Sequence, residues 1–290
     1  MSTSRHTRPS AALRSPVHSR GVSLVELLVG IALGLVVVAV AMASLMTSRG
    51  ITGTVTESTA MQQQASYAFR VIGQQLRQAG SLELSLTPSI VPGADPNSVM
   101  TPVAFDPPDP AGTRAQFDRG VSTIAGTGTT TPTFTVGYQN YVESVTAADD
   151  PVTASLLRDC IGKNEVTSGV PDAAVLVSTF ARDANSNALV CAGTGSETRR
   201  AIISNVTDMR VRYVVQSPLT TNLQYFANPA SVGNWRNVYA LEVCLELSGT
   251  ETVSTPGAQY TNCSGTKTSY GDRLRMVFRN VYQIRSQGQL

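Results

Sequence analysis

An almost unbroken run of apolar residues extends from Val22 to Met46, and Glu26 is the one charged residue within it. A helix of this length crosses the hydrocarbon core of a membrane, which is about 30 Å thick. The residues before the run carry no acidic side chain but carry four arginines, Arg5, Arg8, Arg14 and Arg20. Because positively charged segments stay on the cytoplasmic side, we expect the chain after the run to be exported.

A second helical pattern follows in residues 49–80. Apolar side chains recur there at three- to four-residue spacing, which predicts an amphipathic helix whose apolar face needs a partner. The members of that face are Ile51, Val55, Met61, Ala65, Phe69, Ile72, Leu76 and Ala79. Gly80 is a residue type that commonly ends a helix. A β-sheet is the expected partner of the apolar face.

Strands are predicted in residues 133–290. The runs TFTVGYQNYV, AAVLVSTF and RAIISNV are rich in β-branched and aromatic residues. In VYALEVCLEL, apolar side chains alternate with Glu242, Cys244 and Glu246, and in DRLRMVFRNVYQIR they alternate largely with arginines. Strict alternation predicts an antiparallel sheet with one buried and one wet face. The arginines are expected on the wet face, with an anion-binding face as the alternative.

Residues 81–132, between the predicted helix and strands, form a Pro/Gly-rich connector. Residues 121–135 are rich in Gly, Thr and Ser and are expected to be a loop. Asp106, Asp109 and Asp118 do not have the spacing of a calcium-binding loop. The predicted fold class is therefore α+β, with a long N-terminal helix packed on an antiparallel sheet.

Charge and composition exclude several classes of protein. The chain has 22 basic and 20 acidic side chains, but residues 1–21 hold four of the basic ones and no acid. The remaining chain, with 18 basic against 20 acidic side chains, does not resemble a nucleic-acid-binding protein. Both histidines, His6 and His18, also lie in residues 1–21.

The sequence lacks several common catalytic and phosphate-binding motifs. Without a histidine after residue 21, the chain lacks the imidazole of Ser-His-Asp and Cys-His sites and of histidine-bearing zinc sites. It contains no G-x-S-x-G, no G-x-x-x-x-G-K-[ST] and no G-x-G-x-x-G. We therefore predict that the protein is not an enzyme and has no cofactor or bound metal.

The position of Glu26 is the most specific feature of the sequence. A carboxylate at membrane depth costs about 2.5–3.5 kcal/mol on insertion scales, so it needs a partner or a function. The stretch SRGVSLVELLVGIALG resembles the prepilin signal of type IV pilins and pseudopilins, with Gly21, Val22 and Glu26 at the motif positions. Val22 stands where phenylalanine or methionine is commoner.

This resemblance implies how the N-terminus is processed and used. A prepilin peptidase is expected to cleave between Gly21 and Val22 and to methylate the new amine of Val22. Glu26 is then expected to pair with that amine, within one chain or between subunits, because desolvated charges are stable only when paired. Gly30 and Gly34 form a G-x-x-x-G pattern that lets helices pack closely, although ordinary glycine use in a membrane helix explains them equally well.

Three other interpretations of the N-terminus fit the sequence less well. A secretory signal has a shorter apolar core followed by its cleavage site. A lipoprotein signal needs a cysteine directly after the apolar run, and the first cysteine is Cys160. A plain membrane anchor explains everything except Glu26.

Two further stretches resemble one family of pilins, the PilW-type minor pilins. They are QASYAFRVIGQQLRQAG in the amphipathic helix and VFRNVYQIRSQ at the end of the chain. The family implies a type IV pilin-like fold, with a cleaved leader over 1–21, a transmembrane assembly helix over 22–48, an amphipathic helix over 49–80 and a periplasmic head over 133–290. It also implies an inner-membrane protein that primes pilus assembly and occupies the pilus tip. The implied partners are other minor pilins, the major pilin and a tip adhesin.

Two alternatives to a PilW-type pilin remain open. A minor pseudopilin of a type II secretion system, GspJ-like, shares the signal, the fold and the role of Glu26. A membrane-anchored periplasmic binding protein needs a ligand pocket, to which nothing in the sequence points.

Cys160, Cys191, Cys244 and Cys263 all follow the apolar run, and so lie in an oxidising compartment if the chain is exported. Four cysteines allow three connectivities. The sequential pairs Cys160–Cys191 and Cys244–Cys263 are favoured, because the pair Cys244–Cys263 would tie a Gly/Thr/Ser loop to the strand that carries Cys244. A four-cysteine metal site is disfavoured, since no C-x-x-C occurs.

Overall fold

The computed structural model of the chain describes residues 21–85, 104–105, 117–147, 150–164, 166–167, 170–171, 175–196, 198–216, 222–253 and 257–284. The chain divides into two compact units, Met1–Thr52 and Gly53–Leu290, and each is described by itself. The leader and most of the predicted Pro/Gly-rich connector lie outside the described residues.

One helix, α1 (Leu24–Gln78), contains both predicted helical patterns. The residues from Gly53 onward belong to the second unit, where α1 presents a buried stripe of Met61, Ala65, Ala68, Ile72, Leu76 and Ala79. The buried face begins later than predicted, because Val55 is 59% exposed. Gly80 follows the helix at a φ of 68°, and its N–H donates to the Gly137 carbonyl over 2.8 Å, which confirms the predicted helix end.

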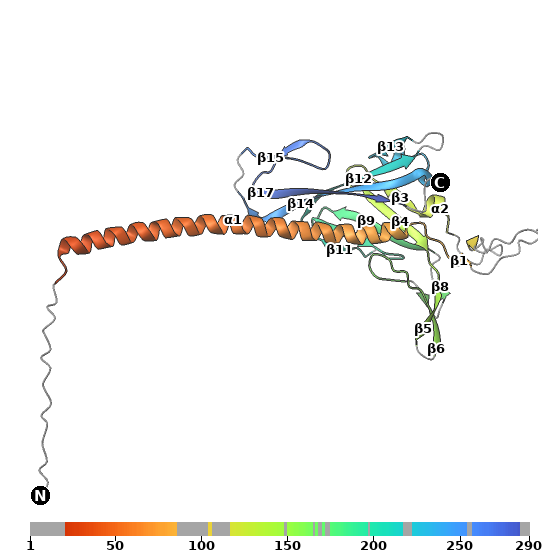
Figure 1. The fold of residues 1–290 in the computed structure, drawn as a ribbon. Helices are drawn as coiled ribbons and strands as arrows, with labels where there is room; N and C mark the ends of the chain where they lie inside the picture. Colours follow the sequence, from red (N-terminus) through yellow and green to blue (C-terminus); the bar gives the residue numbers. More distant parts are fainter. Residues whose placement is uncertain are drawn as a thin grey trace, which may run out of the picture. The chain divides into compact units, whose positions relative to one another are not determined.

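The second unit contains two main sheets, and every strand pairing in them is antiparallel (Figure 1). The first has the order β11-β10-β9-β4-β3. Its strands are β3 (Ile124–Thr127), β4 (Thr133–Gln139), β9 (Val175–Asp183), β10 (Ala188–Ala192) and β11 (Arg200–Ile203). The second has the order β13-β12-β14-β17. Its strands are β12 (Val206–Gln216), β13 (Leu223–Phe226), β14 (Val238–Thr252) and β17 (Arg273–Gln283).

Smaller elements complete the described part of the unit. Four short antiparallel pairs are β1 (Leu84–Ser85) with β2 (Ala104–Phe105), β5 (Glu143–Ala147) with β6 (Asp150–Ala154), β7 (Val166–Thr167) with β8 (Val170–Pro171), and β15 (Gln259–Thr261) with β16 (Lys267–Ser269). The short helices are α2 (Arg119–Ser122), η1 (Pro229–Ser231) and η2 (Trp235–Asn237).

The core joins the second half of α1 to both sheets. Ile72 and Leu76 of α1 share one buried cluster with Phe134 and Phe180 of the first sheet and with Leu245 of the second. The rings of Phe134 and Phe180 stack with their centroids 5.0 Å apart. The alternating strands thus cover the apolar face of the helix, and this arrangement confirms the predicted α+β fold class.

Two local predictions from the sequence are wrong. The segment Ile124–Thr127 is an edge strand and not part of a loop, and Ile124 at its start is 1% exposed. The predicted wet face of β14 is also largely covered, because Cys244 is 1% and Glu246 is 5% exposed. Alternation within one strand cannot reveal a second layer, and here that layer is the β15–β16 hairpin.

Candidate assembly segment and head surface

The start of α1 places Glu26 in its first turn. The Ser23 side chain accepts a hydrogen bond from the Glu26 N–H at 3.2 Å, and the Ser23 carbonyl accepts one from the Leu27 N–H at 3.1 Å. Ser23 therefore occupies the capping position, and Glu26 stands at the third helical residue, the spacing of a capping box. A carboxylate there is stabilised by the positive end of the helix dipole. Val22 directly precedes the cap and is 68% exposed.

The stretch Leu24–Met46 of α1 is long and apolar enough to cross a membrane. Its mean hydropathy is 2.8, and none of its most apolar window is buried within the chain. A Cβ built on Gly30 or Gly34 would meet no atom within 4 Å. Contacts among the described residues therefore do not require these two glycines.

Two disulfides fasten the head, Cys160–Cys191 and Cys244–Cys263. The pairs are the sequential ones that the spacing favours. The first joins the loop after β6 to β10 in the first sheet. The second joins β14 to the loop between β15 and β16, so the hairpin is held against the face of β14 that carries Glu246.

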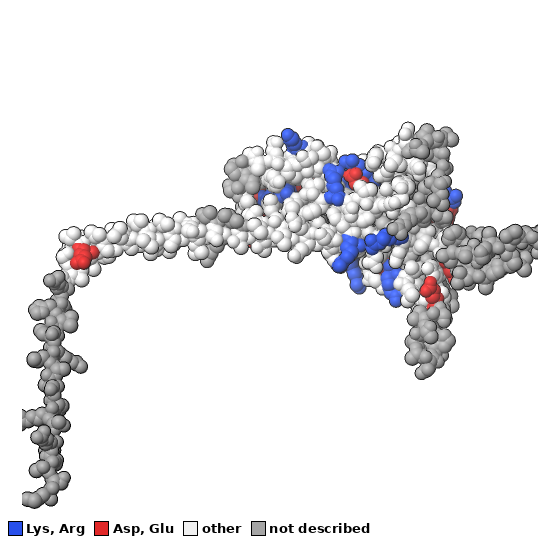
Figure 2. Space-filling model, in the orientation of Figure 1, with Lys and Arg blue, Asp and Glu red and all other residues white. Residues whose placement is uncertain are grey.

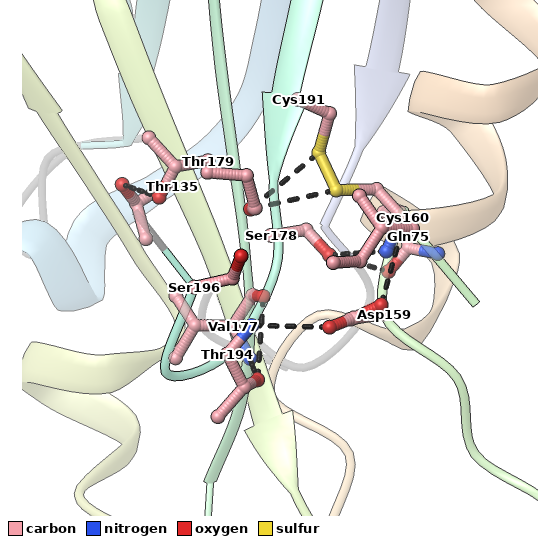
Figure 3. Close-up of a disulfide and its surroundings, with 12 residues drawn as sticks. Gln75, Thr135, Asp159, Cys160, Val177, Ser178, Thr179, Cys191, Thr194 and Ser196 are labelled. Atoms are coloured by element: carbon pink, nitrogen blue, oxygen red, sulfur yellow. Dashed lines mark hydrogen bonds between the residues drawn. A yellow bond between two sulfur atoms is a disulfide. The ribbon is translucent and has the colours of Figure 1, made fainter. Parts of the chain in front are cut away.

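A buried hydrogen-bond network lies beside the first disulfide (Figure 3). Gln75 of α1 is 3% exposed, and its Oε1 accepts from the Ser178 hydroxyl of β9 at 3.0 Å. Ser178 Oγ in turn accepts from the Cys160 N–H at 3.0 Å. The Tyr138 hydroxyl lies 3.0 Å from Gln75 Oε1, and burial, with a contribution from the Asp159 charge, raises the pKa of Tyr138. The network ties α1, β4, β9 and the disulfide together.

Asp159 organises the loop that precedes this disulfide. Its side chain is 3% exposed and accepts from three backbone N–H groups, those of Ile161 at 3.0 Å, Lys163 at 2.9 Å and Thr194 at 3.0 Å. A buried carboxylate that receives three donors is stable without a counterion. Gly193 has no room for a Cβ because Asp159 occupies that space.

Three arginines of β12 and β17, Arg212, Arg275 and Arg279, contact acids of β14, and no anion-binding face is needed to explain them. Glu242 accepts from Arg279 at 3.1 Å and lies 3.7 Å from Arg212, and Glu246 accepts from Arg275 at 3.2 Å. Arg285 lies outside the described residues. These cross-strand pairs neutralise the two glutamates on the face that the hairpin covers.

The hairpin itself completes the site of Glu246. The Tyr260 hydroxyl of β15 donates to Glu246 Oε1 at 2.6 Å, and the Thr207 hydroxyl lies 3.1 Å from the same oxygen. Burial, followed by the hydrogen bond to Glu246, raises the pKa of Tyr260 to about 12. Glu246 is therefore a buried carboxylate whose Oε1 contacts Tyr260, Thr207 and Arg275.

Sequence reasoning missed Gln75 and Glu57, although both leave a signal. Gln75 is a polar residue between Ile72, Leu76 and Ala79 of the predicted apolar face. Glu57 is the one acid of α1 after Glu26, and it binds the end of β14 through the N–H groups of Thr250 and Glu251. In the part of the chain that the structure describes, no group of three His, Cys, Asp or Glu is placed to hold a metal ion.

These features agree with the fold expected from the sequence. A long N-terminal helix has an exposed apolar segment, and its later residues pack on a head of antiparallel sheets, which is the α+β arrangement that the resemblance to type IV pilins implies. Among solved structures, a type IV-like pilin from Thermus thermophilus is similar, with 11% identity and a TM-score of 0.38 over 79% of this chain and 97% of that chain.

The last part of the head is similar to one particular family, PilW. Residues 177–286 match the family model of the type IV pilus-assembly protein W, a stretch that runs from β9 to the end of β17. The match confirms the predicted resemblance to PilW-type minor pilins. It includes nearly all of VFRNVYQIRSQ at the end of the chain, whereas QASYAFRVIGQQLRQAG in the amphipathic helix lies outside it. No curated protein matches the chain.

Proposed function

We propose that the chain is a minor pilin that primes type IV pilus assembly in a complex with other minor pilins at the pilus tip. One observation carries the proposal. An apolar helix capped by Ser23, with Glu26 in its first turn, stands on the same chain before a head that matches PilW over residues 177–286. The major pilin, the inner membrane and a tip adhesin are its further expected partners.

Leu24–Met46 is the proposed single-pass anchor, with the head in the periplasm. The arginines before Val22 keep the leader in the cytoplasm until a prepilin peptidase cleaves between Gly21 and Val22. N-methylation of Val22 follows. The apolar surface of the helix is covered first by lipid and then, after assembly, by the helices of neighbouring subunits, with Gly30 and Gly34 as points of close approach.

Glu26 has two roles in this proposal, at different stages. Before cleavage, its carboxylate lies in the first helical turn, near N–H groups that have no partner within the helix. After cleavage, the new amine of Val22 stands one residue before the cap and offers a full positive charge. Pairing of the amine with Glu26 of a neighbour then makes the carboxylate favourable in the apolar core of the assembly.

The two roles are separated by two substitutions in the native host. Glu26→Ala removes both, whereas Ser23→Ala removes the cap and leaves the carboxylate in place. We expect Glu26→Ala to insert normally into the membrane but to give few or no surface pili, and Ser23→Ala to keep most of them. Electron microscopy counts the pili, and membrane fractionation checks insertion.

Deletion of the gene tests the assignment itself. The expected result is loss of pili, restored by the full chain. A deletion strain that keeps its pili but no longer secretes folded proteins would instead identify a type II pseudopilin. A mature protein that still starts at Met1 would exclude processing.

A further inference from the structure

A groove of about 540 Å³ lies between the second half of α1 and the edge of the first sheet. Gln63, Gln64 and Tyr67 form its helix side, and the residues from Ala201 to Ser204 form its strand side. Tyr67 is 46% exposed, so a large aromatic side chain faces solvent at the groove. A volume of this size accommodates several side chains of a bound segment.

Two arginines border the groove. The Arg70 guanidinium lies over the Tyr67 ring, 5.4 Å from its centroid, and Arg200 directly precedes the strand side of the groove. Both are exposed, and neither contacts a carboxylate among the residues that the structure describes. Figure 2 shows Lys and Arg side chains gathered over the region that Figure 1 labels β9 and β11.

Arginines on the second sheet differ from Arg70 and Arg200 in having acidic partners. Arg212, Arg275 and Arg279 all contact Glu242 or Glu246 within their own sheet. These three arginines are thus neutralised within their own sheet, whereas Arg70 and Arg200 beside the groove have no carboxylate partner among the described residues. A cation without an internal partner, next to an exposed aromatic ring, favours a ligand that brings carboxylates.

The backbone of β11 favours an extended ligand. Among the described residues β11 is the edge of its sheet and pairs only with β10, so its other side can accept a further strand. An arginine on an edge strand discourages indiscriminate pairing and selects for an oppositely charged chain. In the helix wall, Gln64 Oε1 is a buried acceptor without a hydrogen-bond partner among the described residues. A donor from a bound segment would satisfy it.

We propose that this groove binds an extended, carboxylate-bearing segment of another pilin subunit. The apolar side chains of the segment contact Tyr67 and Ile202, its carboxylates contact Arg70 and Arg200, and its backbone pairs with β11. The identification of the partner as a pilin rests on the proposed function. In that proposal each subunit has its own N-terminal helix, and packing of these helices brings the heads of different subunits side by side.

Photo-cross-linking with the full chain in its native host tests the proposal. The photoreactive residue p-benzoylphenylalanine replaces Tyr67 in one strain and Tyr225, which is 59% exposed on β13, in the control strain. We expect position 67 to cross-link to an acidic segment of another protein with a prepilin signal, and position 225 to give at least fivefold less of that product. Mass spectrometry of the cross-linked peptides identifies the segment.

Charge reversal then tests the chemistry. The double variant Arg70→Glu/Arg200→Glu should reduce the cross-link at position 67 about tenfold, since two attractive contacts become repulsive. Lys267→Glu, on the exposed hairpin strand β16, is the matched control and should leave it unchanged. Replacing the partner's carboxylates by arginine should restore the product. Unchanged thermal unfolding shows that each variant is folded.

Several outcomes would overturn the proposal. One is an equal amount of cross-linked product at positions 67 and 225. Another is a cross-link to the same chain, to a second copy of it or to lipid. A third is a cross-linked segment that carries no carboxylate. A cross-link to a protein outside the pilus overturns the assignment to a pilin. The pilus count of the deletion strain reports separately on the proposed function, so the two failures are distinguishable.

Discussion

The Glu57 carboxylate of α1 accepts the backbone N–H of Glu251 at the end of β14, over 2.6 Å. The same oxygen accepts from the N–H and from the hydroxyl of Thr250, and the carboxylate fills the space that a Cβ of Gly249 would need. The early part of the helix in the second unit is thus attached to the longest strand of the head by one side chain.

Glu57→Ala should lower the free energy of unfolding by about 1–3 kcal/mol, because the strand end loses its acceptor. Glu57→Gln keeps an acceptor oxygen at the same place and should lose clearly less. Denaturant unfolding of the full chain in detergent micelles measures both. Equal losses for the two variants would show that the charge, and not the hydrogen bonds, holds the strand end.

Gly126 is required by the Tyr213 hydroxyl, which lies where a Cβ would stand. Tyr213 is fully buried and packs edge-on against Trp235, so it cannot move away easily. Gly126→Ala should therefore cost about 1–3 kcal/mol by overpacking. Gly233→Ala, with no atom within 4 Å of the new Cβ, is the control and should be nearly neutral in the same unfolding measurement.

The Cys244–Cys263 disulfide closes a loop with a sequence separation of 19 residues. Replacing both cysteines by alanine should lower the free energy of unfolding by about 3 kcal/mol, since the unfolded chain gains freedom. Hydrogen exchange should become faster mainly in the β15–β16 hairpin. Protection of the hairpin equal to that of the unaltered protein would show that Tyr260 and Glu246 hold it without the disulfide.

Stability should fall at alkaline pH. The folded chain raises the pKa of Tyr260 to about 12, whereas an unfolded tyrosine has a pKa of about 10. The unfolded state therefore binds fewer protons between these values, and the stabilising contribution, full below pH about 10, is lost as pH rises towards 12.

The Tyr260→Phe variant tests this origin. Unfolding measured across the same alkaline range should show a shallower decline for the variant. Some decline will remain, because burial also raises the pKa of Tyr282 to about 12. A variant with the full original slope would mean that Tyr260 does not contribute.

The periodic parts of the fold could be predicted from the sequence. Leu76 and Ile72 follow the helical spacing, and the alternation in β12 and β14 reports the buried inner face. Alternation alone assigns Cys244 and Glu246 to solvent, because it reports one strand and not the hairpin that folds over it. β3 was missed since its residues, IAGT, carry little β-branched or aromatic signal.

One part of the candidate site could likewise be predicted from the sequence and another part could not. Gly21, Val22 and Glu26 form a contiguous motif, so their expected role can be stated from the sequence alone. The groove between α1 and β11 combines Tyr67 and Arg70 with Arg200, which are brought together only when the sheet packs on the helix. No local pattern contains that information.

Gln75 fixes which face of α1 is turned towards the sheets of the head. Its Oε1 accepts from Ser178 of β9, Tyr138 of β4 lies at hydrogen-bonding distance, and its Nε2 donates to the Arg158 carbonyl. Rotating the helix about its axis would separate the buried Gln75 side chain from these partners. Each residue of an α-helix advances the chain by about 100°. One extra residue inserted between Glu57 and Gln75 would therefore swing Glu57 away from β14 while Gln75 stayed in place. The number of residues between Glu57 and Gln75 therefore determines whether both side chains can face the head at once.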